Sequence, residues 1–191
     1  DAGAARDGEM GGLASTVSRM LDEGTTQRDT TAIAAAFEQV GASFGASSYR
    51  DMAVAELRVL SDPAFLAPAL DVFRDVIAHP VFPADAFART QQSSEVGQRQ
   101  QDQSPAALAS RIFYQELYKG HPYAHPPSGS RATLSKLTRE DLVQFHQRFY
   151  VARNLTIALV GSVDREQAEQ VAEAISNALP AGEPAPALSA A

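Results

Sequence analysis

The sequence predicts a fold of the α/β class, more narrowly α+β, in which helices form one layer and a mostly antiparallel sheet the other. Three observations lead to this two-layer sandwich. Most segments carry apolar residues at helical spacing, residues 42–60 alternate apolar and polar side chains, and residues 154–163 form an apolar run. A chain of 191 residues, 45% of them hydrophobic, is long enough for one such domain.

The first predicted helix covers residues 12–25 and has two distinct faces. Its apolar residues recur at i, i+3 and i+4 spacing and form the expected buried stripe, which consists of Leu13, Ala14, Val17, Met20 and Leu21. The other face carries Ser15, Ser18 and Arg19. Gly24 is suited to end the helix, because glycine accepts the left-handed conformation common after helix C-termini.

A second helix, a hairpin and a third helix are predicted next. The second helix is capped by Asp29 or Thr30 and stops at Gly41. Two short alternating runs within residues 42–60 predict a β-hairpin. An Asp-Pro pair then opens a helix over residues 63–78.

The middle of the chain is expected to hold two helices of opposite character. Residues 84–101 form a polar helix, which is typical of a solvated helix or of one that lines a cavity. Residues 105–117 form an amphipathic helix, and we expect its apolar side to face the core. That side consists of Leu108, Ile112, Phe113 and Leu117. A loop rich in Gly and Pro follows at residues 119–131.

The last third of the chain is predicted to contain two helices separated by a strand. A capping box of Thr138 and Asp141 begins the first helix. Residues 154–163, NLTIALVGSV, are the clearest strand of the chain, and Asp164 caps a final helix that ends near residue 179.

The composition excludes several classes of protein. The net charge of −7 argues against a nucleic-acid partner, because binding phosphates requires a basic face. Without cysteine the chain has no disulfide, no thiolate nucleophile and no Cys-ligated zinc. No apolar run reaches about 18 residues, so we expect no membrane span. The chain begins at Asp1 rather than Met, and we expect that an upstream segment was removed.

Five segments carry a family resemblance: GGLASTVSRMLDEGT, the helix after Asp62-Pro63, HPYAHPPSGS, LTREDLVQFHQRFY and NLTIALVGSV. In this order they resemble the N-terminal half-domain of the M16 family of zinc metallopeptidases. The resemblance implies that residues 1–179 are an M16-like half-domain whose first strand is truncated. Residues 180–191 are then a linker or tail rich in Pro and Ala.

In active members of this family the first helix carries His-x-x-Glu-His. Residues i and i+4 share a helix face, so both His side chains can bind one zinc ion while the Glu serves as general base. With GLA and ML-x-x-GT setting the register, the resemblance puts Ser15 and Arg19 at the His positions and Ser18 at the Glu position. It puts Glu95 at the downstream ligand position. We therefore expect a degenerate site with no catalytic residue and no metal, and zinc only in an active partner.

Two interpretations of Glu95 stay open. It can form an ion pair with Arg19 in place of the metal bridge, or it can be one more charge on a polar helix. Under either interpretation Arg19 places a cation about where Zn²⁺ would lie, which should repel the metal. A single carboxylate cannot hold a catalytic zinc, which takes about three protein ligands.

The histidines offer no clear alternative site. His121 and His125 lie four residues apart, but the prolines around them exclude a regular helix, so we expect a structural loop there. His79 stands at a predicted helix end, and His146 lies inside a predicted helix. Both are expected to be structural.

Three functional hypotheses follow. The resemblance implies a non-catalytic subunit that pairs with an active M16 peptidase subunit or a second half-domain and encloses peptide substrates in a shared chamber. The alternative is a stand-alone scaffold or peptide-binding module like the bc1 core proteins of that family. An active zinc endopeptidase with a displaced metal site would need at least two ligands that the sequence does not show. We expect a periplasmic location, with the cytoplasm as the alternative.

Overall fold

The computed structural model describes residues 1–188. The helices are α1 (Leu13–Arg19), α2 (Thr30–Gln39), α3 (Pro63–Ala78), α4 (Ala84–Asp102), α5 (Pro105–Leu117), α6 (Arg131–Leu134), α7 (Arg139–Phe149) and α8 (Arg165–Ala178). The strands are β1 (Ser43–Ser48) and β2 (Ala53–Arg58). Short 3₁₀ turns connect them: η1 (Ala4–Arg6), η2 (Leu21–Glu23), η3 (Pro122–Ala124) and η4 (Ala152–Asn154).

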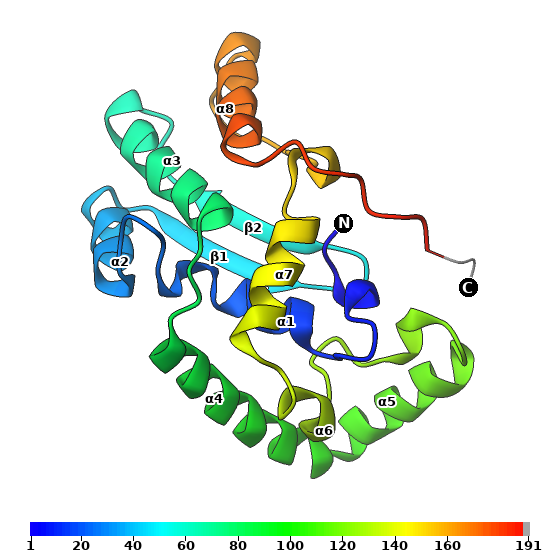
Figure 1. The fold of residues 1–191 in the computed structure, drawn as a ribbon. Coiled ribbons are helices and arrows are strands. Elements are labelled where there is room, and N and C mark those ends of the chain that lie inside the picture. Colours follow the sequence, from blue (N-terminus) through cyan, green and yellow to red (C-terminus); the bar gives the residue numbers. More distant parts are fainter. Residues whose placement is uncertain (189–191) are drawn as a thin grey trace.

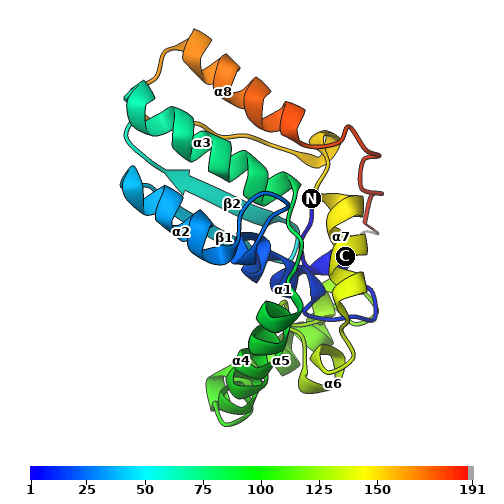
Figure 2. The ribbon, with the colours of Figure 1, turned by 60° about the vertical axis from the view of Figure 1, so that its left-hand side comes forward.

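The helices are arranged in layers around one antiparallel hairpin. Strands β1 and β2 pair with Ser43 opposite Arg58 and Ser48 opposite Ala53. Helix α3 lies along the hairpin, and α8 lies beyond α3 (Figure 2). Helix α1 packs against the hairpin and α7, while α4 and α5 lie on the far side of α1 from the hairpin (Figure 1). The structure thus confirms the mixed fold of helices and antiparallel strands.

The main core forms around α1 and α7. All five residues of the predicted stripe are buried. The predicted end of the helix at Gly24 is wrong, because α1 ends at Arg19 and Leu21 lies in the separate turn η2. Leu142 and Phe145 of α7 belong to the same cluster. A smaller cluster of Phe73, Ile77 and Ile175 joins α3 to α8. Burying about 25 cal/mol per Å² of apolar surface in these clusters is the main force that holds α1 in place.

Side-chain caps fix the start of several helices where the sequence predicts them. The carboxylate of Asp29 accepts the backbone N–H of Ala32 at 2.8 Å and begins α2. Thr138 and Asp141 form the expected capping box of α7. Asp164 caps α8. Each cap satisfies amide groups that a helix leaves unpaired at its first turn.

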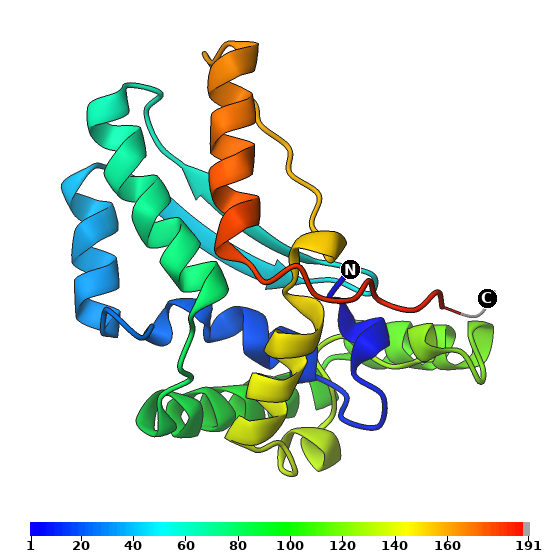
Figure 3. The same ribbon diagram turned by 45° about the horizontal axis from the view of Figure 1, so that its top comes forward.

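The predicted strand at residues 154–163 is wrong. After η4 the chain runs as an irregular segment to α8 (Figure 3), and Val160 is 100% exposed. A β-strand needs a neighbour to complete its backbone hydrogen bonds. Within residues 1–188 the hairpin is the whole sheet, and neither of its strands pairs with this segment.

The predicted orientation of residues 105–117 is also wrong. Ile112, Phe113 and Leu117 are between 57% and 59% exposed, and α5 contributes no buried residue. Helix α5 lies beyond α1 and turns its other face, with Tyr114, toward η3 and the loop after it. The spacing of apolar residues identifies the helix correctly but does not show whether its apolar face packs against the core or faces solvent.

The C-terminal segment is held by hydrogen bonds over its first part. The backbone N–H of Ala152 donates to the carbonyl of Pro180 at 2.9 Å, and that of Ala185 donates to the side chain of Asn154 at 2.7 Å. Residues 180–188 run back past η4 (Figure 3). The predicted tail includes residues 189–191, which lie outside the described part of the chain. In residues 1–188, every helix is too short or too polar to cross a lipid bilayer.

Candidate functional site

The N-terminus of α1 is fixed by a buried carboxylate. Asp7 accepts the backbone N–H of Gly12 at 2.7 Å and that of Ala14 at 2.8 Å. Burial raises the pKa of Asp7 to about 7, and the backbone hydrogen bonds oppose this shift. Gly12 has a φ of 95°, which favours glycine. These contacts set the orientation in which α1 presents its polar residues.

The three polar residues of α1 have different surroundings. Ser15 is half-buried and Arg19 is exposed, whereas Ser18 is only 2% exposed. The hydroxyl of Ser18 lies 3.4 Å from that of Tyr150, the residue that ends α7. The position that the resemblance gives to a general base is therefore a buried hydroxyl against a phenol.

No base lies in position to activate Ser18 within the described structure. Burial raises the pKa of Tyr150 to about 12, so the phenol stays protonated near neutral pH. Next to it, the ring of His146 stacks on Tyr150 with ring centroids 4.8 Å apart. Its Nε2 lies 2.9 Å from the carbonyl of Ile77, so this nitrogen carries the proton and donates it. Burial lowers the pKa of His146, which keeps the ring neutral and structural.

Of the two interpretations of Glu95, the ion pair with Arg19 is not formed. Arg19 donates to the hydroxyl of Ser94 at 2.9 Å and to that of Ser93 at 3.3 Å, both on α4. Glu95 instead pairs with Arg99 and Arg131, each at 2.9 Å. Arg99 lies one helical turn from Glu95, and Arg131 is the first residue of α6, which packs against α4. Arg99 first, and then Arg131, lower the pKa of Glu95.

Helix α4 is tied to α1 and to the loop before α6 at several points. Besides the Arg19 contacts, the buried side chain of Gln98 donates to the carbonyl of Ser128 at 3.1 Å. Gly129 lies so close to Gly11 that a Cβ on Gly129 would fall 2.3 Å from the Gly11 carbonyl oxygen. Its φ of 72° also favours glycine. Helix α4 is thus joined to α1 through the side chain of Arg19 and to the loop before α6 through Gln98.

The donor groups on this face do not suit zinc. Zinc in proteins binds thiolate, imidazole or carboxylate, and Ser15, Ser18 and Arg19 supply none of these. Glu95 supplies a carboxylate, but two guanidinium groups already occupy it. Within residues 1–188, no group of three or more His, Cys, Asp or Glu residues could hold a metal ion. No catalytic step through a metal can be assigned to these residues.

The other histidines have structural contacts. The Nδ1 of His121 accepts the backbone N–H of Tyr123 at 3.2 Å and caps η3, as expected for a structural loop. His79 ends α3, and its Nδ1 lies 3.5 Å from the carboxylate of Asp75.

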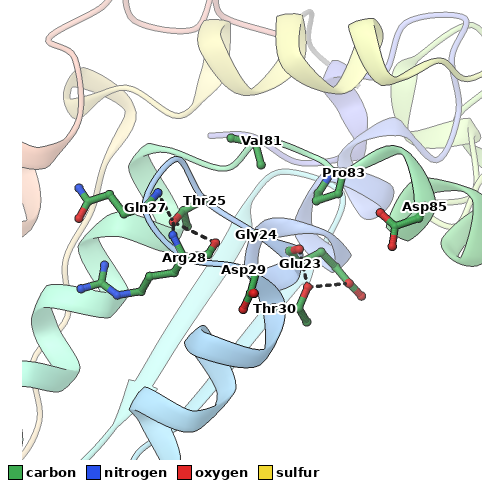
Figure 4. Close-up of a pocket in the computed structure, with 10 residues that line it drawn as sticks. All are labelled: Glu23, Gly24, Thr25, Gln27, Arg28, Asp29, Thr30, Val81, Pro83 and Asp85. Atoms are coloured by element: carbon green, nitrogen blue, oxygen red, sulfur yellow. Dashed lines mark hydrogen bonds between the residues drawn. The ribbon is translucent and has the colours of Figure 1, made fainter.

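A separate hollow of about 400 Å³ lies between the turn before α2 and the start of α4 (Figure 4). Its charged side chains already have partners, most of them outside the hollow. Glu23 and Asp85 both pair with Arg89, Arg28 pairs with Asp71 and Asp75, and Asp29 caps α2. None of the residues predicted to mark the α1 site lines this hollow. It therefore adds no reactive group to the candidate site.

Sequence reasoning did not find four residues that complete the surroundings of the α1 face: Ser93, Ser94, Arg131 and Tyr150. The two serines lie directly before Glu95 on α4, so their position near Arg19 could have been predicted from that of Glu95. Tyr150 lies 132 residues from Ser18, and no local pattern connects them.

Comparison with protein families covers most of the chain. The family described as "Insulinase (Peptidase family M16)" matches residues 1–129. The family described as "Peptidase M16 inactive domain" matches residues 136–190.

The individual relatives have names that agree with these families, and each relative is longer than this chain. An "Uncharacterized zinc protease" from Rickettsia felis is 30% identical over 92% of this chain and 42% of its own length. The crystal structure of a "peptidase M16 inactive domain" from Pseudomonas fluorescens has a TM-score of 0.95 and 41% identity, covering 98% of this chain and 46% of that chain. The periplasmic protease PqqL from Escherichia coli has a TM-score of 0.84 at 21% identity, over 98% of this chain and 21% of that chain. This chain thus spans less than half the length of these relatives.

Proposed function

The chain belongs to peptidase family M16, and from this membership we propose that it is part of a non-catalytic subunit that pairs with an active zinc peptidase subunit of the same family. The two would enclose peptides in a shared chamber, in which the partner supplies the zinc and the general base. This chain would supply wall and peptide-binding surface.

One observation carries the proposal: α1 is intact, while the positions that the resemblance gives to the zinc ligands and the general base hold Ser15, Arg19 and Ser18. The apolar stripe, the Asp7 cap and the contact with α7 keep the helix in place. The polar face carries a half-buried serine, a buried serine and an arginine bonded to α4. Keeping the helix without its ligands is typical of a scaffold that serves assembly rather than hydrolysis.

The match to the family described as an inactive domain supports the same interpretation, as does the likeness to the Pseudomonas fluorescens structure of that description. The relatives named as zinc proteases are longer, so their activity belongs to proteins of which this chain resembles less than half.

The first test is the zinc content of the purified full-length protein, with Glu95→Gln as the matched variant. We expect fewer than about 0.1 zinc ions per chain for both, because a catalytic site needs about three protein ligands. About one zinc per chain that is lost in Glu95→Gln, together with chelator-sensitive peptide hydrolysis by the protein alone, would overturn the proposal.

The second test is assembly. We expect the full-length protein to form a stable complex with a family member that carries His-x-x-Glu-His, measured by analytical ultracentrifugation. Cleavage of a fluorogenic peptide should require that partner. A protein that stays solitary would instead support the stand-alone scaffold. The periplasmic location stays a prediction, which cell fractionation tests against the cytoplasm.

A further inference from the structure

A second cavity, of about 280 Å³, lies at the end of the molecule formed by α5. Its walls come from α5, the last turn of α4, the loop around residues 124–129 and Arg50 in the β1–β2 turn. It is separate from the α1 face, since neither Ser15, Ser18, Arg19 nor Glu95 lines it.

The charge of this cavity differs from that of the whole chain. The chain carries a net charge of −7, yet two arginines, Arg50 and Arg111, line the cavity and no carboxylate does. Arg50, which forms no salt bridge in the described part of the chain, gives the cavity a local positive potential, which attracts an anion.

Arg50 is held in position but keeps most of its hydrogen-bonding capacity. Its guanidinium lies 3.7 Å from the ring centroid of Tyr114, and its Nε donates to the carbonyl of Tyr123 at 3.3 Å. Across residues 1–188, no carboxylate lies within 4.0 Å of its nitrogens. The adjacent Asp51 accepts the hydroxyl of Tyr123 instead. The terminal nitrogens of Arg50 are thus available to a ligand.

Arg111 and two neutral groups extend the polar side of the cavity. Arg111 pairs with Asp102 at 3.1 Å, which uses part of its guanidinium. Gln101 accepts the hydroxyl of Ser128, which leaves its NH₂ group to donate, and Ser110 supplies a hydroxyl. Charged and neutral donors therefore line the same cavity.

The remaining walls are apolar. The ring of Tyr114 and the side chains of Pro126 and Pro127 can cover the carbon atoms of a small group, while the arginine fork faces its oxygens. Arginine binds carboxylates through two parallel hydrogen bonds, and a cavity of this size suits a single amino-acid side chain or chain end.

We propose that this cavity binds a carboxylate of a peptide, held by Arg50 with support from Arg111. The carboxylate comes from a Glu or Asp side chain or from a C-terminus. The preference for a carboxylate rests on the cavity alone, whereas the identification of the ligand as a peptide rests on the proposed function.

Three peptides of equal length distinguish the sources, with binding to the full-length protein measured by isothermal titration calorimetry. Ac-AAEAA-NH₂ offers only a side-chain carboxylate, Ac-AAAAA-OH only a C-terminal one, and Ac-AAQAA-NH₂ neither. We expect the neutral peptide to bind at least tenfold more weakly than one or both acidic peptides. Equal binding of all three would overturn the proposal.

Arg50→Gln and Arg111→Gln test the site, and Arg165→Gln on the distant helix α8 is the control with the same change of net charge. We expect Arg50→Gln to weaken binding of the acidic peptide at least tenfold, Arg111→Gln to weaken it severalfold, and Arg165→Gln to leave it unchanged. If all three variants weakened binding of the acidic peptide equally, the effect would come from net charge alone, which would contradict binding in this cavity. Circular dichroism checks that each variant is folded.

This test is independent of the first proposal. Zinc content and partner assembly do not depend on Arg50, so a protein that assembles without binding zinc but does not distinguish the peptides would refute the cavity alone. A protein that holds zinc and still prefers acidic peptides through Arg50 would refute only the non-catalytic role.

Discussion

Asp7→Asn should change how the stability of the domain depends on pH. In the folded protein the pKa of Asp7 is about 7, against an ordinary value of 3.8, because the carboxyl is buried at the start of α1. The folded state therefore holds this proton more tightly than the unfolded chain. The stability from Asp7 is complete below its unfolded pKa and is lost as pH rises through the folded pKa.

The size of the effect follows from these two values. One pKa unit corresponds to about 1.4 kcal/mol, so the free energy of unfolding attributable to Asp7 should fall by roughly 2.5 kcal/mol between about pH 5 and pH 8. The side-chain amide of the Asp7→Asn variant would not titrate. The difference in unfolding free energy between the wild type and this variant should therefore shift by that amount in favour of the variant over this range.

Urea unfolding followed by circular dichroism at several pH values measures this difference. Asp164→Asn is the matched control, since Asp164 caps α8 at an exposed site. A difference between wild type and Asp7→Asn that stays flat from about pH 5 to pH 8 would refute the reasoning. It would mean that the hydrogen bonds from Gly12 and Ala14 outweigh burial and keep the folded pKa near its ordinary value.

Three further predictions concern packing and the contact between two buried hydroxyls. Gly129→Ala should destabilise the fold by about 2–4 kcal/mol, because its Cβ would strike the Gly11 backbone. Gly97→Ala on α4 has open space for the Cβ and should stabilise the fold by about 0.5–1 kcal/mol. Thermal unfolding measures both variants, and equal effects would contradict the close approach of Gly129 to Gly11. Phe113→Ser should change the unfolding free energy by less than about 1 kcal/mol because Phe113 is exposed, whereas Phe73→Ser should cost more than about 3 kcal/mol because Phe73 is buried. A large cost at Phe113 would mean that this side of α5 is buried, as the sequence predicted. Tyr150→Phe and Ser18→Ala should each cost about 1 kcal/mol or less, with a coupling below about 0.5 kcal/mol in a double-mutant cycle, because their hydroxyls are 3.4 Å apart; a coupling above about 1 kcal/mol would show a stronger bond than this distance implies.

Local signals predicted the helices and their caps well. Asp29, Thr138 and Asp164 cap as expected, because a cap depends on residues only two or three positions away. The stripe of α1 was also predicted correctly, since helical spacing alone defines which side chains share a face.

Predictions that depended on a distant partner were less successful. Residues 154–163 have the pattern of a strand, but a pattern does not supply the neighbouring strand that would pair with them. At Glu95 the sequence left two interpretations open, and it could not show that Arg131, from a different element, pairs with this carboxylate. The contact of Ser18 with Tyr150 and the grouping of Arg50 with Tyr114 likewise depend on how separate elements fold together.

The two guanidinium groups on Glu95 make the proposed loss of the metal site difficult to reverse in evolution. Restoring the three ligand and base positions of α1 would leave Glu95 bonded to Arg99 and Arg131, on two other parts of the chain. Of the three positions only residue 18 lies against the buried Tyr150, so a carboxylate there would be buried without completing a zinc site. A reversal would therefore pass through sequences that bury an unpaired carboxylate, and these would lose stability before any of them could bind zinc.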